Sequence, residues 1–146
     1  MCDNNINDAV NANPSKYEIR EQAFFLCFES LFSDTDIDEI ADNAGDARDE
    51  IISAPAIERA KGVVEHQDEI DAVISSKLKS GWKLTRISRV ALAVLRLAVY
   101  EMKYIDDDEI PVSVAINEAV ELSKKFTVKE DTAFINGVLG AVAKEL

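Results

Sequence analysis

Apolar residues recur every three or four positions along most of this chain, which is the spacing of α-helices that bury one face. No stretch alternates apolar and polar residues with a period of two for long enough to predict a strand. We therefore predict an all-α fold, a compact two-subdomain helical bundle with about six to seven helices. The predicted helices cover residues 15–31, 37–47, 55–78, 88–105, 111–126 and 127–146.

Two of the predicted helix starts have a recognisable capping pattern. Ser15 and Glu18 have the spacing of a capping box, in which a serine oxygen and a glutamate satisfy backbone N–H groups reciprocally. Thr127 and Glu130 repeat this spacing before the last helix. Both pairs predict that a helix begins at that point.

The distribution of polar and apolar residues also predicts the domain organisation. Residues 1–14 are polar and rich in asparagine, which is typical of a flexible N-terminal tail. The chain is 47% apolar, enough to bury a core, and we expect residues 15–146 to form one compact domain of two packed subdomains. Gly81, within the helix-breaking run Ser80-Gly81-Trp82, divides this domain into an N-terminal helical subdomain, 15–80, and a C-terminal one, 81–146.

The formal net charge of −12 hides one basic segment. Residues 77–103 contain seven Lys and Arg residues and a single acidic one, whereas residues 34–50 and 105–121 are strongly acidic. This pattern predicts one positive surface on an otherwise negative protein. Such a surface is typical of proteins that bind RNA phosphates, although pairing with a nearby carboxylate is the simpler interpretation of any single lysine.

Position singles out particular arginines within this surface. Arg86 and Arg89 fall in and just after the turn before a helix, where planar guanidinium groups suit phosphate or base contacts. Arg96 stands among apolar residues, so it either pairs with a carboxylate at the core edge or joins the basic face. Lys16 and Arg20 are four residues apart on the first helix and could extend that face.

Aromatic side chains could stack on unpaired RNA bases. Of the candidates we expect only Phe134 to be exposed, and we expect Trp82 and the others to pack between helices. The candidates are Tyr17, Trp82, Tyr100, Tyr104 and Phe134.

Other classes of protein fit the sequence less well. No segment has the length and apolarity of a membrane span, and no export signal precedes the domain, which together predict a cytoplasmic protein. Cys27 fits a small core residue. His66 lies among polar residues without a nucleophile at helical spacing, so we expect no enzyme activity, no metal site and no cofactor.

Three blocks of sequence resemble the NusB family of bacterial transcription antitermination factors. They read LRLAVYE at 95–101, IPVSVAINEAVEL at 110–122 and FINGVL at 134–139. The resemblance extends roughly from Ser15 to the C-terminus and implies a NusB-like fold of two helical bundles. It also implies a factor that binds the boxA element of nascent rRNA transcripts with the NusE ribosomal protein, within the RNA polymerase antitermination complex.

The resemblance also implies roles for individual residues. Lys16 and Arg20 match the basic start of the family's first helix, Arg96 its Leu-Arg pair and Phe134 its Phe-Ile-Asn-Gly block. Glu130 and Asp131 match an acidic and polar turn beside the RNA-facing surface. With Arg86 and Arg89 from the charge pattern, the candidate RNA-binding residues are therefore Lys16, Arg20, Arg86, Arg89, Arg96, Glu130, Asp131 and Phe134.

Asn117 and Asn136 stand in otherwise apolar helical stretches. A buried asparagine must satisfy both ends of its amide, so we expect both to be structural, each bonding the backbone of a neighbouring helix. We expect Gly137 to permit a close approach of two helices.

An alternative function fits the same fold. A thinned arginine stretch at the first helix, the acidic balance, and Ala91-Leu92 in place of an acidic and a basic residue are consistent with an interaction module whose RNA binding is weakened or lost. The acidic residues 34–50 could attract a basic partner in either case.

Overall fold

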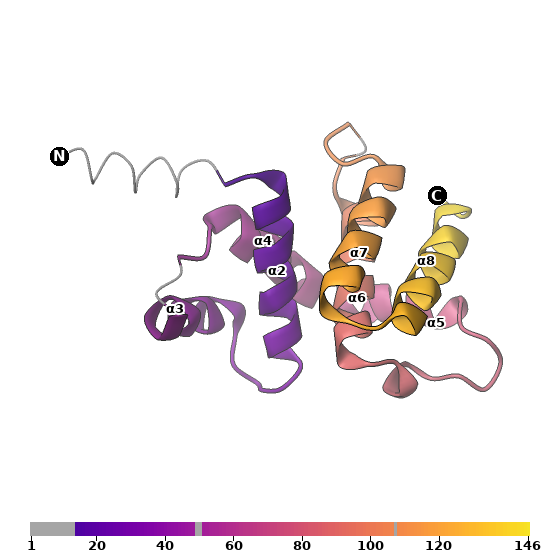
Figure 1. Ribbon diagram of the computed structural model, residues 1–146, viewed down its shortest axis with the longest axis horizontal. Helices are drawn as coiled ribbons and strands as arrows, with labels where there is room; N and C mark the ends of the chain where they lie inside the picture. The colour runs from indigo at the N-terminus through magenta and orange to yellow at the C-terminus, as the bar shows by residue number, and fades with distance from the viewer. Residues whose placement is uncertain (1–13, 49–50, 107) are drawn as a thin grey trace. The chain divides into compact units, whose positions relative to one another are not determined.

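The computed structural model describes residues 14–48, 51–106 and 108–146 (Figure 1). They form seven α-helices and one 3-10 turn, and none of these residues is in a strand, which confirms the all-α prediction. The elements are α2 (Lys16–Ser30), α3 (Ile37–Arg48), α4 (Ala54–Glu65), α5 (Gln67–Ser76), η1 (Leu84–Arg86), α6 (Arg89–Tyr104), α7 (Val112–Phe126) and α8 (Lys129–Ala143). The predicted tail, residues 1–14, lies outside the described residues except for Pro14.

The chain divides into two compact units, Met1–Lys61 and Gly62–Leu146. This division falls within α4, whereas the helix-breaking run at Gly81 predicted a subdomain boundary there. The difference arises from α5, which packs against α6 and α8 of the second unit. Its residues Ile70 and Ile74 are completely buried, so the helix belongs to the C-terminal core.

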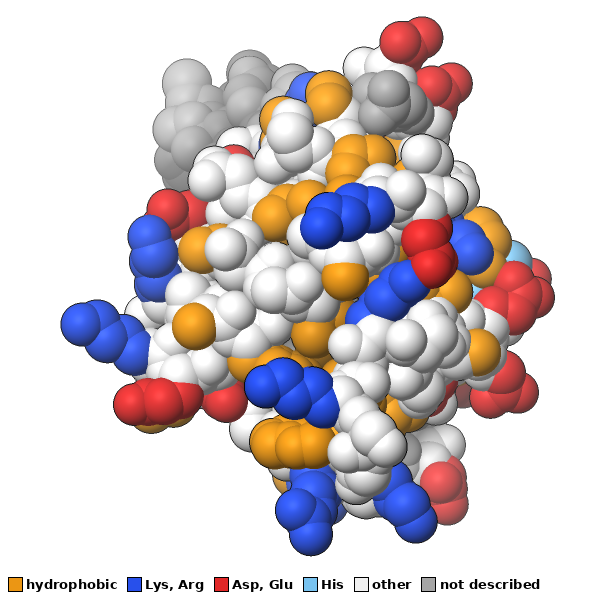
Figure 2. Space-filling view, turned by 90° about the vertical axis from the view of Figure 1, so that its right-hand side faces the viewer, with side chains coloured by type: hydrophobic (Ala, Val, Ile, Leu, Met, Phe, Trp, Pro, Cys, Tyr) orange, Lys and Arg blue, Asp and Glu red, His pale blue; other side chains and the backbone are white. Residues whose placement is uncertain are grey.

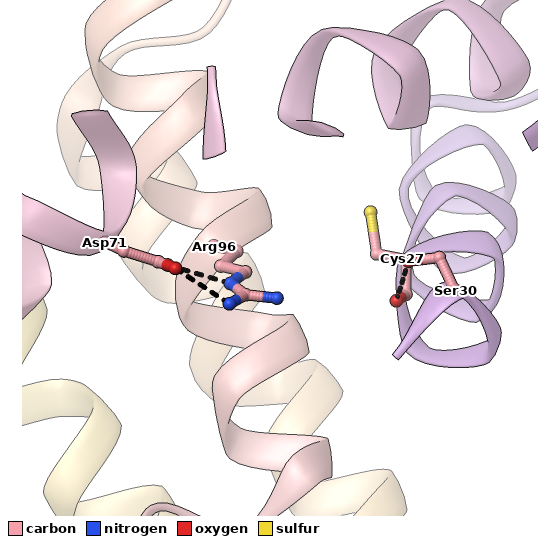
Figure 3. A network of polar contacts seen from close by, with 4 residues as sticks. All are labelled: Cys27, Ser30, Asp71 and Arg96. Carbon is pink, nitrogen blue, oxygen red and sulfur yellow. Dashed lines mark hydrogen bonds and ion pairs between the residues drawn. The ribbon is translucent and has the colours of Figure 1, made fainter. Parts of the chain in front are cut away.

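In the first unit, α2 packs against α3. A side-chain bond holds α2 to the segment before α4: the Gln22 side-chain oxygen accepts hydrogen bonds from the backbone N–H (2.9 Å) and the hydroxyl (2.8 Å) of Ser53. Cys27 is buried in this core as predicted, and its carbonyl accepts a 2.7 Å hydrogen bond from the Ser30 hydroxyl (Figure 3). The buried residues of the two helices are Arg20, Ala23, Phe24, Leu26, Cys27, Ile37, Ile40, Ala41 and Ala44.

In the second unit, α6 is the central helix and packs against α5, α7 and α8. Its sequence is apolar almost all round, which fits a helix with neighbours on several sides. The Ser123 hydroxyl joins α7 to α8 through a 2.9 Å hydrogen bond with the Thr132 hydroxyl. Among the described residues, no helix is both long enough and apolar enough to span a membrane.

The two predicted capping boxes have different outcomes. The Ser15 hydroxyl accepts from the backbone N–H of Glu18 at 3.0 Å, which confirms the start of α2. The prediction for Thr127 was wrong, because α8 begins after Val128 with no side-chain cap. The Thr127 hydroxyl donates instead to the carboxylate of Asp131, at 2.5 Å.

The prediction of one continuous helix over residues 55–78 was also wrong, because α4 and α5 are separate helices. The helical stretch is interrupted at His66, whose backbone leaves the helical region with φ −101° and ψ 14°. The His66 ring is stacked on Tyr104 with centroids 4.1 Å apart and lies 6.1 Å from the ring of Tyr100. This packing against α6 occurs at the point where the chain changes from α4 to α5.

Candidate nucleic-acid interface

The start of α6 is fixed to the start of α8 by a small hydrogen-bond network. Ser88 caps α6, because its hydroxyl oxygen accepts from the backbone N–H of Ala91 at 3.1 Å. The same hydroxyl donates to the Asp131 carboxylate at 2.8 Å. Thr127 donates to the same carboxylate oxygen, so Asp131 joins three segments of the second unit. Asp131 thus has a positioning role that the sequence did not reveal.

This network brings most of the predicted RNA-binding residues of the second unit together. Arg86 and Arg89 stand on either side of Ser88 in the chain, and both are exposed. Glu130 is exposed beside Asp131, and Phe134 follows on the same helix with its side chain partly exposed. The segments that carry these two arginines, two carboxylates and one aromatic ring therefore meet at one hydrogen-bonded point.

Trp82 extends this cluster, contrary to the expectation that it packs between helices. Its side chain is 47% exposed, and its ring is stacked on that of Phe134 with centroids 6.0 Å apart and planes at 29°. A sequence signal was available, because Trp82 directly follows Gly81 in a basic loop and not in an amphipathic helix. Gly81 has a φ of +88°, in the left-handed region that favours glycine.

The charge around these rings is mainly positive on the loop side. Lys79, Lys83 and Arg86 are all exposed in the segment that carries Trp82. Figure 2 views the side of the molecule on which α8 and the 77–88 segment lie in Figure 1, and it shows Lys and Arg side chains beside hydrophobic surface on the lower part of that face. Cations beside exposed rings can bind phosphates and stack on bases.

The NusB family matches residues 17–144. The chain belongs to the NusB family. It is 41% identical over 135 residues to the transcription antitermination protein NusB of Agathobacter rectalis, a match that covers 88% of this chain and 99% of the relative. It is similar to the structure of T. maritima NusB, with a TM-score of 0.78 and 33% identity over 91% of this chain and 93% of that one. The crystal structure of antitermination factors NusB and NusE in complex with dsRNA shares the fold, with a TM-score of 0.77 and 22% identity over 90% and 97% of the chains.

Arg96, in the NusB-like motif LRLAVYE, does not join the basic face. Its guanidinium group donates two hydrogen bonds of 2.8 Å to the two carboxylate oxygens of Asp71 on α5 (Figure 3). Only 11% of the arginine side chain and 20% of the aspartate side chain is exposed. The structure therefore supports the first alternative, an ion pair at the core edge.

The two basic residues of α2 also differ in their exposure to solvent. Lys16 is exposed in the first turn of α2, but Arg20 is only 4% exposed and is one of the buried residues of this helix. Spacing alone predicted one exposed face for both. Burial of Arg20 removes it from the accessible surface, so only Lys16 of this pair remains a candidate.

The structural roles predicted for Asn117, Asn136 and Gly137 were wrong. Both asparagines are exposed, and they line a groove of about 630 Å³ along α7 and α8 with Ile116 and Ala133. A methyl group added at Gly137 would meet no atom within 4 Å, so this glycine does not serve a close approach of helices. The apolar neighbours of the asparagines in the sequence occupy other faces of the same helices.

Proposed function

We propose that this chain is a transcription antitermination factor that binds boxA-type RNA of nascent rRNA transcripts together with the NusE ribosomal protein. It works in the cytoplasm as part of the RNA polymerase antitermination complex, by binding and not by catalysis. The curated relative of similar length carries the name transcription antitermination protein. A protein with the same fold forms a complex with NusE and double-stranded RNA.

The observation that carries the proposal is the fixed start of α6. The Ser88 hydroxyl accepts a hydrogen bond from the backbone N–H of Ala91 and donates one to Asp131, which holds the segment that carries exposed Arg86 and Arg89 to the first turn of α8. Because hydrogen bonds already fix the backbone there, little backbone entropy is lost when the two guanidinium groups bind phosphate. We therefore assign the main phosphate contacts to Arg86 and Arg89, with Lys16 as a further exposed cation.

Fluorescence anisotropy of a labelled boxA-like RNA tests this proposal. The RNA is titrated with the protein alone and with the NusE-type ribosomal protein, at low and moderate salt. We expect binding that weakens as salt rises and tightens when the partner is present. The double variant Arg86→Glu/Arg89→Glu should lose at least tenfold in affinity, since it replaces two phosphate contacts by repulsion.

A control with the same change in charge separates local contacts from the overall field. Lys103 lies in the last turn of α6 and Lys144 follows the end of α8, and both are exposed. Along α6 alone, Lys103 is roughly 21 Å from Arg89 at 1.5 Å per residue. Lys103→Glu/Lys144→Glu should therefore bind RNA nearly as the original protein does. Equal losses in the two double variants would contradict the assignment to Arg86 and Arg89.

A second candidate function is an interaction module on the same fold. It is favoured by the burial of Arg20 and Arg96, which leaves fewer accessible cations than the sequence suggests. In the same titrations this module would bind the ribosomal protein without binding RNA under any salt condition. That result would favour the interaction module over the antitermination factor.

A further inference from the structure

A cavity of about 310 Å³ lies beside the stacked rings of Trp82 and Phe134. This volume is at the lower end of the range of about 300–1,000 Å³ for small-ligand sites. Trp82 and Phe134 form part of its wall, and Ala133 and Gly137 contribute small residues from α8. Because a methyl group at Gly137 would have no atom within 4 Å, the space next to the rings is open at this point.

The loop holds the Trp82 ring in place before any ligand arrives. The backbone N–H of Trp82 donates to the carbonyl of Lys79 at 3.0 Å, which closes a turn through Gly81. One side of the ring rests on Phe134, yet 47% of the side chain remains exposed. An exposed ring that is held in this way can accept a second flat group without reorganisation of the loop.

The charges around the cavity indicate which flat group it accepts. The described residues that line it include Lys77 and Lys79 and no acidic residue. Lys77 is already paired with Glu145, whereas Lys79 is exposed, and Lys83 is exposed directly after Trp82. An aromatic wall with cations at its edge is suited to a base whose flanking phosphates need neutralisation.

We propose that this cavity binds one unstacked base of single-stranded RNA, which stacks against Trp82, with Lys79 and Lys83 on the adjacent phosphates. This inference rests on the proposed RNA-binding function. It adds to that function a specific site for a base, and it assigns to Trp82 a direct contact with RNA.

The protein contains a single tryptophan, so its tryptophan emission, excited where tyrosine absorbs little, reports on this site alone. The full chain is titrated with a boxA-like RNA, and with an oligonucleotide of the same length whose bases have been removed. We expect RNA to quench the tryptophan emission over the same concentrations at which anisotropy shows binding. The abasic strand should bind through its phosphates, more weakly, without this quenching.

Two variants test the site by different changes: one removes the Trp82 ring, and the other keeps the ring and fills the cavity. Trp82→Leu should weaken RNA binding about tenfold or more, the loss expected for one base–aromatic stack. Gly137→Leu keeps both rings but fills the cavity, and it should cause a similar loss while helical content is unchanged. Ala72→Leu adds the same side chain at an exposed position of α5 and should leave RNA binding unchanged.

The outcomes separate this inference from the function on which it rests. The base site would be overturned, and RNA binding left intact, by two results together. Anisotropy would show RNA binding while the tryptophan emission is unchanged, and Gly137→Leu would bind RNA with full affinity. Absence of RNA binding in the anisotropy measurement would overturn both. Quenching by RNA that the abasic strand and Gly137→Leu both lack would establish the site.

Discussion

Tyr104 is the residue whose ionisation depends most clearly on the fold. Its hydroxyl donates a 2.5 Å hydrogen bond to the carboxylate of Glu69, which joins α6 to α5. The bond exists only while the phenol keeps its proton. This hydrogen bond, with burial and the negative charge of Glu69, raises the pKa of Tyr104 from 10.0 to about 12.

The shift predicts a loss of stability in strongly alkaline solution. Because the pKa is higher in the folded chain, the stabilisation from this bond is complete below pH 10 and is lost between pH 10 and about 12. Ultraviolet titration of the tyrosines should show a late step from Tyr104, which Tyr104→Phe removes and Glu69→Gln moves to lower pH. Tyr17→Phe, at an exposed tyrosine, should leave the late step in place. A late step that survives Tyr104→Phe would contradict this assignment.

The arginines show where residue-level interpretation of the sequence stops. Arg86 and Arg89 were correctly expected to be exposed, because they stand at a turn and at a helix start. Arg20 and Arg96 were misassigned or left open, because their burial depends on what packs against them. The partner of Arg96 is Asp71, 25 residues away in the chain, and no local pattern indicates that pairing. Charge patterns therefore located the basic segment but not which of its side chains are exposed.

At the level of secondary structure, the join between α4 and α5 depends on three stacked rings. His66 lies against Tyr104, and Tyr104 lies 5.5 Å from Tyr100 with planes at 26°. Gly62, in the last part of α4, leaves the space that the Tyr100 ring occupies, since a methyl group at Gly62 would overlap that ring. The glycine is thus required by tertiary packing and not by its backbone angles.

Two glycine substitutions should therefore change stability in opposite directions. Gly62→Ala gains up to about 1 kcal/mol of helix propensity, but overpacking against a stacked ring costs about 1–3 kcal/mol. We expect a net destabilisation on the order of 1 kcal/mol. Gly140→Ala, in α8 with no atom within 4 Å of the added methyl group, should stabilise by roughly 0.5–1 kcal/mol. Urea unfolding followed by circular dichroism measures both, and a stabilised Gly62→Ala variant would show that Tyr100 moves aside freely.

Helices were predictable because apolar periodicity is a local property, and every predicted helical stretch corresponds to at least one helix of the structure. Interruptions and caps were less predictable. The break at His66 depends on rings from α6. The Thr127 hydroxyl donates to Asp131 and does not accept from a backbone N–H, as a capping box requires. Trp82 shows the same limit at the candidate site, since its exposure follows from the turn at Gly81 and from its contact with Phe134.

At the scale of the whole molecule, two opposing electrostatic effects act on RNA binding. The net charge of −12 repels a polyanion at long range, while Lys79, Lys83, Arg86 and Arg89 form a local positive segment. Salt screens exposed charges beyond a Debye length of about 8–10 Å, so the long-range repulsion weakens first as salt is added. The contacts that remain are the direct ones between these side chains and phosphates.

The local contacts predict a clear dependence of RNA affinity on salt. If each of the four cations neutralises one phosphate of single-stranded RNA, the slope of log K against log salt is roughly −3, at about −0.7 per contact. Arg86→Gln/Arg89→Gln should reduce the magnitude of the slope by about 1.4, because two contacts are removed without added repulsion. Anisotropy titrations over a series of potassium chloride concentrations measure both slopes. An unchanged slope in the double variant would mean that other cations bind the phosphates, with Lys16 of α2 the first to test.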